Sequence, residues 1–237
     1  MKPANALLIF LEPMTIHRRN NSEGYGDLTW RDLDVFYNMM LDDVVAGALQ
    51  LLNTDVYTDL NNVQTSDEFE NRFLTRMNIL PSTGGSLTER VHRGIEMAYS
   101  QQYQRVIVLL KIHPLIHRDV LERIFGMLTC EEDCLVVTPT DEGKYLLVGM
   151  KSNHSDLFLP SGSQGSDDAS WLHDRISRSD ASIFPTPTLY TLNSGQNLER
   201  LKDEVDRIDG KQRSLVHRTH EAFNDLQLNH RSRKIFR

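Results

Sequence analysis

Continuous apolar runs mark the buried strands of this chain. Residues 6–11 (ALLIFL) and 105–110 (RVIVLL) carry apolar side chains at consecutive positions rather than at alternate ones. Such runs are typical of parallel strands that helices cover on both faces. The second run is the stronger and predicts the centre of the sheet. Shorter runs predict further strands at 55–58, 78–80, 135–138 and 145–150.

Segments with apolar residues at helical spacing alternate with these strands. They predict helices from Thr29, at 66–77, from Ser86, and at 117–128, 169–178 and 198–208. Two of the starts have capping-box spacing: Thr29 with Asp32, and Ser86 with Glu89. The alternation predicts an α/β three-layer sandwich with a mainly parallel, Rossmann-like sheet. Residues 183–192 are extended but contain two prolines, which indicates an edge strand or irregular structure.

The stretch 105–150 places two polar loops at strand ends. Residues 111–114 (KIHP) follow the central strand, and residues 141–144 (DEGK) precede the last strand of the stretch. An open α/β sheet binds its ligand outside the carboxyl ends of its strands. We therefore expect the ligand site at these loops, with Lys111, His113 and Asp141 as candidates.

Charge divides the chain into two parts. The net charge is -7, yet residues 211–237 hold seven Lys or Arg against two acids. We predict one domain at 1–210 and a basic tail with a helical pattern at 211–237. The overall negative charge argues against a general nucleic-acid binder. The tail is either a solvated helix or a contact for an acidic partner such as another protein, for its own acidic body, or for nucleic acid.

The remaining composition limits the class of protein. No run of about 18 apolar residues is present, so we expect no membrane span. Cys130 and Cys134 form neither a disulfide framework nor a complete zinc ligand set, and we expect buried or partly buried thiols. A cytoplasmic, reducing location is the default expectation.

Two segments have the composition of anion sites. Arg18 and Arg19 lie in a polar loop directly after the first strand, and Gly84 and Gly85 precede the helix that starts at Ser86. Backbone N–H groups at a helix start, like Arg side chains, can hold phosphates. The alternatives are an ordinary solvated loop and simple helix capping.

Three segments together resemble a family of small bacterial GT-A-type proteins, described as nucleotide-diphospho-sugar transferases or glycosyltransferase-like. They are the first strand ALLIFLEP, the helix start GSLTERV at 85–91, and DEGKYLLVG at 141–149, which corresponds to the family's Asp-Gly-Gly-Tyr-Tyr-Leu segment. The resemblance runs from about residue 6 to 201. It implies a GT-A-type sheet, a nucleotide-sugar or nucleotide ligand, and phosphate or nucleotide contacts from Glu89 and Arg90.

The departures from the family fall on its chemistry. The family's strand-end loop carries a metal-binding Asp where this chain has Ile112. A later acidic pattern is replaced by the uncharged run TLNSGQNL at 191–198, and the first loop lacks the family's phosphate-gripping motif. A metal-dependent transferase needs carboxylates to hold Mg²⁺ or Mn²⁺ against the diphosphate. Asp141 and Glu142 are the remaining candidates for that task, and a solvated acidic turn is their alternative.

Two hypotheses about function follow. The first is a divergent glycosyltransferase-like enzyme, related to the nucleotide-diphospho-sugar transferases. Its catalytic residues would be Asp141 and His113, its phosphate contacts Arg18, Arg19 and Lys111, and it would need Mg²⁺ or Mn²⁺ only if the metal chemistry persists. The second is a catalytically inactive member of the family that serves as a binding or scaffold protein.

Overall fold

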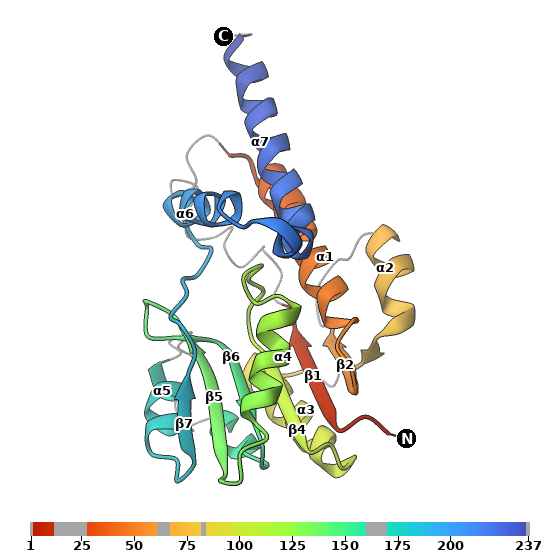
Figure 1. The fold of residues 1–237 in the computed structure, drawn as a ribbon, viewed down its shortest axis with the longest axis vertical. Coiled ribbons are helices and arrows are strands. Elements are labelled where there is room, and N and C mark those ends of the chain that lie inside the picture. The colour runs from red at the N-terminus through yellow and green to blue at the C-terminus, as the bar shows by residue number, and fades with distance from the viewer. Residues whose placement is uncertain (1, 12–27, 61–66, 82–83, 160–169, 236–237) are drawn as a thin grey trace.

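A computed structural model of the chain describes residues 2–11, 28–60, 67–81, 84–159 and 170–235 (Figure 1). The strands are β1 (Asn5–Phe10), β2 (Thr54–Asp59), β3 (Asn78–Ile79), β4 (Arg105–Leu109), β5 (Cys134–Pro139), β6 (Tyr145–Met150) and β7 (Ser182–Pro185). The α-helices are α1 (Trp30–Ala48), α2 (Asp67–Phe73), α3 (Leu87–Ser100), α4 (Arg118–Met127), α5 (Ser170–Ser177), α6 (Gly195–Asp206) and α7 (His217–Ile235). Short 3-10 helices are η2 (Leu74–Arg76), η3 (Ser155–Phe158) and η4 (Gly210–Val216).

The strands of the described residues form one sheet in the order β3-β2-β1-β4-β6-β5-β7. Every neighbouring pair is parallel except the two that involve β6, which runs antiparallel to β4 and to β5. The predicted α/β class with a mainly parallel sheet is therefore confirmed, and β4 lies at its centre. β7 is an edge strand, because Pro185 and Pro187 supply no N–H to continue the ladder.

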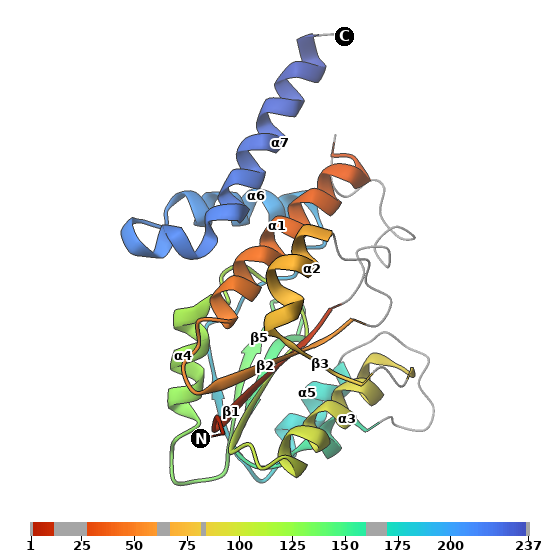
Figure 2. The same cartoon turned by 90° about the vertical axis from the view of Figure 1, so that its right-hand side faces the viewer.

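Helices cover both faces of the sheet (Figure 2). One core lies between the sheet and α1, α2 and α4, and it continues to α6 and α7. The other lies between the sheet and α3 and α5. All six residues of β1 and of β6 are buried, as expected for strands covered on both sides.

The segment after Gly210 packs onto the body through α7. Asp43 of α1 accepts hydrogen bonds from the backbone N–H and the hydroxyl of Thr219, at 2.7 and 2.8 Å. Beside them, the rings of Phe36 and Phe223 lie 4.7 Å apart. The first half of α7 thus belongs to the same core as α1, while its far end projects away from the sheet (Figures 1 and 2). Within the described part of the chain, no helix is long and apolar enough to cross a membrane.

The two predicted capping boxes are present. Thr29 and Asp32 exchange hydrogen bonds at the start of α1, and Ser86 and Glu89 do so at the start of α3. Gly85 makes the second possible, because its φ is 94° and a Cβ there would lie 2.3 Å from a Glu89 carboxylate oxygen. The helix predicted at 66–77 is shorter than expected: α2 ends at Phe73 and continues as one 3-10 turn.

Candidate ligand site at the carboxyl edge of the sheet

The parallel strands β1, β2, β3 and β4 end at one edge of the sheet. The chain passes from β1 to β2 and β3 on one side, and β4 then pairs with the other side of β1. The order of the strands therefore reverses between β1 and β4, which is where open α/β sheets bind ligands. Two groups of side chains lie at this edge, one on each side of the reversal.

The first group surrounds a cavity of about 210 Å³ between α3 and the ends of β1, β2 and β3. Its lining residues are Phe10, Asp59, Leu80, Pro81, Arg90, Arg93, Gly94 and Met97. Pockets for drug-sized ligands measure about 300–1,000 Å³. The cavity therefore has room for one ring system rather than for a whole nucleotide-sugar. Its walls are mainly apolar, and its charged side chains are those of Asp59, Arg90 and Arg93.

The charged groups of this cavity are organised around Asp59, the last residue of β2. Its side chain is buried, and its Oδ2 accepts a hydrogen bond from Arg90 Nε at 2.6 Å. Arg90 also donates to the carbonyl of Gly85 at 3.0 Å, and Arg93 donates to the carbonyl of Gly84. The pair thus joins the end of β2 to the start of α3 and gives the cavity a fixed carboxylate.

Gly94 sets how closely α3 approaches the sheet. A Cβ at this position would lie 3.1 Å from Cζ of Phe10 and 3.5 Å from side-chain atoms of Leu8 and Leu80. Any larger residue would therefore push α3 and Phe10 apart or reduce the cavity. The glycine is required by the cavity wall rather than by backbone conformation.

The second group is centred on Tyr190, beyond the end of β7. The ring of His113 meets the ring of Tyr190 edge to face at 5.1 Å, and the guanidinium of Arg200 lies 4.0 Å from the centre of the same ring. The Tyr190 hydroxyl donates to Glu204 at 2.7 Å. Tyr190 is therefore held between a histidine and an arginine, with its hydroxyl on a carboxylate.

His113, a predicted catalytic residue, lies in the core rather than in an open loop. It is 1% exposed; its Nδ1 accepts from the N–H of Leu115, and its Nε2 has no hydrogen-bond partner among the residues that the structure describes. Burial, reinforced by the positive charge of Arg200, lowers the pKa of His113 to about 3. The imidazole is therefore neutral at physiological pH.

The acidic turn between β5 and β6 makes contacts within the protein. Asp141 is exposed, and its Oδ2 lies 3.7 Å from Arg200. Glu142 Oε1 accepts from Thr191 and Asn193, each at 2.7 Å, and its Oε2 lies 3.1 Å from Lys144. The hydrogen bond from Thr191, followed by those from Lys144 and Asn193, lowers the pKa of Glu142. Both acids thus bind parts of their own chain.

The other predicted site residues are divided between these groups. Glu89 caps α3: the backbone N–H of Ser86 donates to its carboxylate at 2.8 Å, and this hydrogen bond is the main cause that lowers the pKa of Glu89. Lys111 is half-buried at the end of β4, where its N–H donates to the carbonyl of Leu146 at 3.3 Å. Arg18 and Arg19 lie outside the described residues.

The position expected to hold a divalent ion does not suit one. Ile112 is 8% exposed and belongs to the core beneath α1 and α4, so the family's metal-binding carboxylate is replaced by a packed aliphatic side chain. Among the described residues, no group of three or more His, Cys, Asp or Glu side chains is arranged to hold a metal ion. Asp141 lies near Arg200, and Glu142 pairs with Lys144 and two neutral donors, so a metal ion at these acids would compete with contacts of their own chain.

Sequence reasoning missed Asp59, Tyr190 and Arg200. The available signal for Asp59 was its place: an acid directly after the buried second strand, at the edge where ligands bind. No local sequence pattern distinguishes Tyr190 or Arg200. Tyr190 contacts His113, and Arg200 lies near Asp141, and both of these partners come much earlier in the chain.

Comparison with known proteins agrees with this architecture. The family described as "Uncharacterized protein conserved in bacteria (DUF2064)" matches residues 45–161. A solved protein from Desulfovibrio desulfuricans G20, described provisionally as a nucleotide-diphospho-sugar transferase, has a TM-score of 0.71 at 16% identity, over 95% of this chain and 96% of its own. A cytidylyltransferase from Leptospira borgpetersenii is more remote, with a TM-score of 0.47 at 13% identity, over 97% of this chain and 95% of its own. No curated protein matches the sequence significantly. The chain therefore has the fold of the nucleotide-diphospho-sugar transferases, and the predicted resemblance is confirmed at that level.

Proposed function

We propose that this protein binds a nucleotide or nucleotide-sugar at the carboxyl edge of its sheet, and that it acts as a binding protein with impaired metal-dependent transfer chemistry. The observation that carries the proposal is the cavity around Asp59 and Arg90, next to the strand-order reversal of a transferase fold. The base of the nucleotide occupies this cavity, and its phosphates extend toward the end of β1.

The chemistry of the cavity suits a base that carries an amino group. Phe10 and Met97 offer apolar surface to a planar ring, and the buried carboxylate of Asp59 can accept hydrogen bonds from it. Cytosine, adenine and guanine each have an exocyclic amino donor, whereas uracil and thymine lack one. A fixed carboxylate favours the bases with an amino group, because uracil and thymine offer only a ring N3–H between two carbonyl oxygens, which the carboxylate repels.

The contacts of the remaining acids, Asp141 and Glu142, favour a binding role over metal-dependent catalysis. Ile112 replaces the metal-binding position, and Asp141 and Glu142 are held by cations and neutral donors of the same chain. The negative charge that develops on a nucleotide diphosphate leaving group must be neutralised during transfer. Without a metal, that task would fall to basic side chains such as Lys111, Arg18 and Arg19.

An active, metal-independent transferase is the second candidate. It would use Asp141 at the acceptor, as the exposure of this carboxylate allows. His113 is the weak part of that mechanism, because a neutral imidazole buried against Tyr190 has no access to an acceptor in this conformation.

Isothermal titration calorimetry with UDP-, GDP- and CDP-sugars, each with and without Mn²⁺, tests the proposal. We expect binding of GDP- or CDP-sugars in preference to UDP-sugars. Mn²⁺ should change the affinity less than about threefold, because no group of three or more candidate ligands among the described residues is arranged to hold the ion. Asp59→Asn should weaken binding about tenfold or more, and Asp203→Asn, at an exposed acid of α6, should leave it unchanged.

Three results would contradict parts of this proposal. Absence of binding to every nucleotide-sugar in both conditions overturns the binding role. Tight binding that requires Mn²⁺ overturns the inference that the metal chemistry is impaired. Release of free sugar or a glycosylated product from a bound nucleotide-sugar in the absence of metal favours the active transferase instead.

A further inference from the structure

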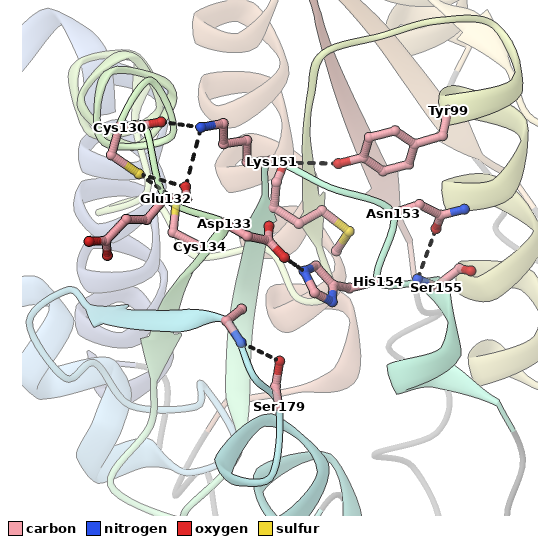
Figure 3. Close-up of polar contacts among 12 residues, drawn as sticks. Tyr99, Cys130, Glu132, Asp133, Cys134, Lys151, Asn153, His154, Ser155 and Ser179 are labelled. Atoms are coloured by element: carbon pink, nitrogen blue, oxygen red, sulfur yellow. Dashed lines mark hydrogen bonds and ion pairs between the residues drawn. The ribbon is translucent and has the colours of Figure 1, made fainter.

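The turn between α4 and β5 brings together the two cysteines of the chain. The sulfur atoms of Cys130 and Cys134 lie 2.9 Å apart, and both residues are free thiols (Figure 3). A disulfide requires a sulfur–sulfur distance of about 2.05 Å, so less than about 1 Å separates this contact from a covalent bond. We propose that Cys130 and Cys134 form a reversible intramolecular disulfide when the protein meets a small-molecule disulfide such as oxidised glutathione.

Lys151, the residue after β6, holds the turn in a shape that keeps the thiols together. Its ammonium group donates to the carbonyls of Cys130, Glu131 and Glu132, the last two at 2.7 and 3.2 Å (Figure 3). An ammonium group has three N–H donors, and all three bind successive carbonyls of this one turn. Because the backbone is already ordered around Lys151, closing the bond costs little further conformational entropy.

The two thiols differ in access to solvent. Cys130 is half-buried, and its S–H donates to the carbonyl of Glu132 at 3.3 Å as well as to Cys134. Cys134 begins β5 and has no exposed surface. Burial, together with the contact to Cys130, raises the pKa of Cys134 to about 12, so it stays protonated at neutral pH. Cys130 is therefore the thiol that meets the oxidant, and Cys134 is the one that follows.

The reaction is an ordinary thiol–disulfide exchange in two steps. Cys130 releases its proton to solvent, and its thiolate attacks one sulfur of the small disulfide, which expels one small thiolate and leaves a mixed disulfide on Cys130. The sulfur of Cys134 then attacks Cys130 Sγ, and the second small thiol leaves with the proton of Cys134. In total, the two protein thiols lose two electrons and two protons, and the small disulfide is reduced to two thiols.

The thiol pair lies at the opposite edge of the sheet from the nucleotide cavity. β5 runs in the same direction as β1 and β2, because two antiparallel pairings separate it from β4. Cys134 is at the beginning of β5, whereas Asp59 is at the end of β2. The proposal is therefore independent of nucleotide binding.

Mass spectrometry of the full chain in mixtures of reduced and oxidised glutathione tests the proposal. The expected product is a monomer lighter than the reduced chain by the mass of two hydrogen atoms, and dithiothreitol should restore the original mass. Because the chain has two cysteines, that mass identifies the bond without further mapping. A stable glutathione adduct, dimers alone, or unchanged thiols in oxidised glutathione would each overturn the proposal.

Variants separate the roles of the two sulfur atoms and of Lys151. Cys134→Ala should stop at a glutathione adduct on Cys130, and Cys130→Ser should acquire no adduct, because Cys134 is buried. Lys151→Met should slow closure roughly tenfold through loss of order in the turn, while Lys202→Met, at a partly exposed lysine of α6, should close at the native rate. Closure of Lys151→Met at the native rate would contradict the role of the lysine. Circular dichroism of each variant checks its fold, and the native chain's mass change decides the proposal if a variant does not fold.

Discussion

Arg90 of α3 donates a hydrogen bond from its Nε to the buried carboxylate of Asp59, at 2.6 Å and across 31 positions of sequence. The pair joins the first turn of α3 to the end of β2. It also presents a carboxylate of fixed orientation to the cavity. One contact therefore stabilises this edge and, in the proposed function, also orients the carboxylate that recognises the ligand.

Loss of the Arg90 guanidinium should destabilise the protein more than loss of an exposed cation. Arg90→Met removes the guanidinium that donates to the buried Asp59 carboxylate, and we expect a loss of roughly 3 kcal/mol in the free energy of unfolding. Urea denaturation measures it. Lys202→Met, which removes an exposed helical ion pair with Asp206, should cost less than about 0.5 kcal/mol. Equal losses of unfolding free energy in the two variants would show that the Arg90–Asp59 contact contributes no more than an exposed ion pair.

Gly94 should tolerate no side chain at the cavity wall. In Gly94→Ala the new methyl group would press on Phe10, and we expect a loss of about 1–3 kcal/mol in stability together with weaker nucleotide binding. Gly126→Ala is the matched control, since a Cβ at this helical glycine meets no atom within 4 Å. That change should stabilise the protein by about 0.5–1 kcal/mol. Thermal unfolding measures the change in stability, and calorimetry measures nucleotide binding. Native-like nucleotide binding by Gly94→Ala would contradict the role of the cavity.

His113 should make the protein sensitive to acid. Its pKa is lowered to about 3 in the folded protein, so below about pH 6.5 the unfolded chain binds a proton that the folded chain excludes. Stability from this residue is therefore lost as pH falls, with a slope approaching about 1.4 kcal/mol per pH unit. His113→Phe should flatten that part of the pH profile of unfolding.

The control for this measurement is His217→Phe, at an exposed position of α7. It should keep the slope of the native protein. If His113→Phe shows the native slope as well, the imidazole is protonated in the folded state, and the neutral, core-like His113 described above is wrong.

Glu142 should contribute stability in the same direction as His113, at neutral rather than at acidic pH, but over a lower pH range. Hydrogen bonds from Thr191, Lys144 and Asn193 lower the pKa of its carboxyl group below 4.5. The contribution is therefore present above pH 4.5 and is lost as pH falls through the lowered value. Glu142→Gln should lower the Tm by roughly 2 °C at neutral pH, and the difference should vanish in acid.

Glu199→Gln, at an exposed acid of α6, provides the comparison and should change the Tm at neither pH. If the Tm difference between Glu142→Gln and the native protein did not change with pH, the negative charge of Glu142 would not be what stabilises the contact between the acidic turn and the segment after Tyr190. Retained binding of metal-free nucleotide-sugar by Glu142→Gln would fit a structural role for this acid.

Local patterns predicted the elements because their causes are local. The runs at 6–11 and 105–110 are buried on both faces, and each capping box needs a Ser or Thr and an acid three positions apart. The direction of β6 was not predictable in this way, because periodicity reports which side chains are buried and not which way a strand runs. The site was harder still. His113 follows a strand as a loop residue does, yet Tyr190, 77 positions later, packs against its ring.

The amino-acid sequence by itself determined the α/β class, the central position of β4, the helix starts and the absence of a carboxylate at Ile112, since each depends on residue type over a few positions. Only the tertiary structure decided that Asp59 meets Arg90, that Glu142 is held by Thr191, and that two thiols touch around Lys151. These contacts join segments distant in sequence or, for the thiols, depend on Lys151, which follows β6. Their formation follows from the packing of helices onto both faces of the sheet, which no local pattern encodes.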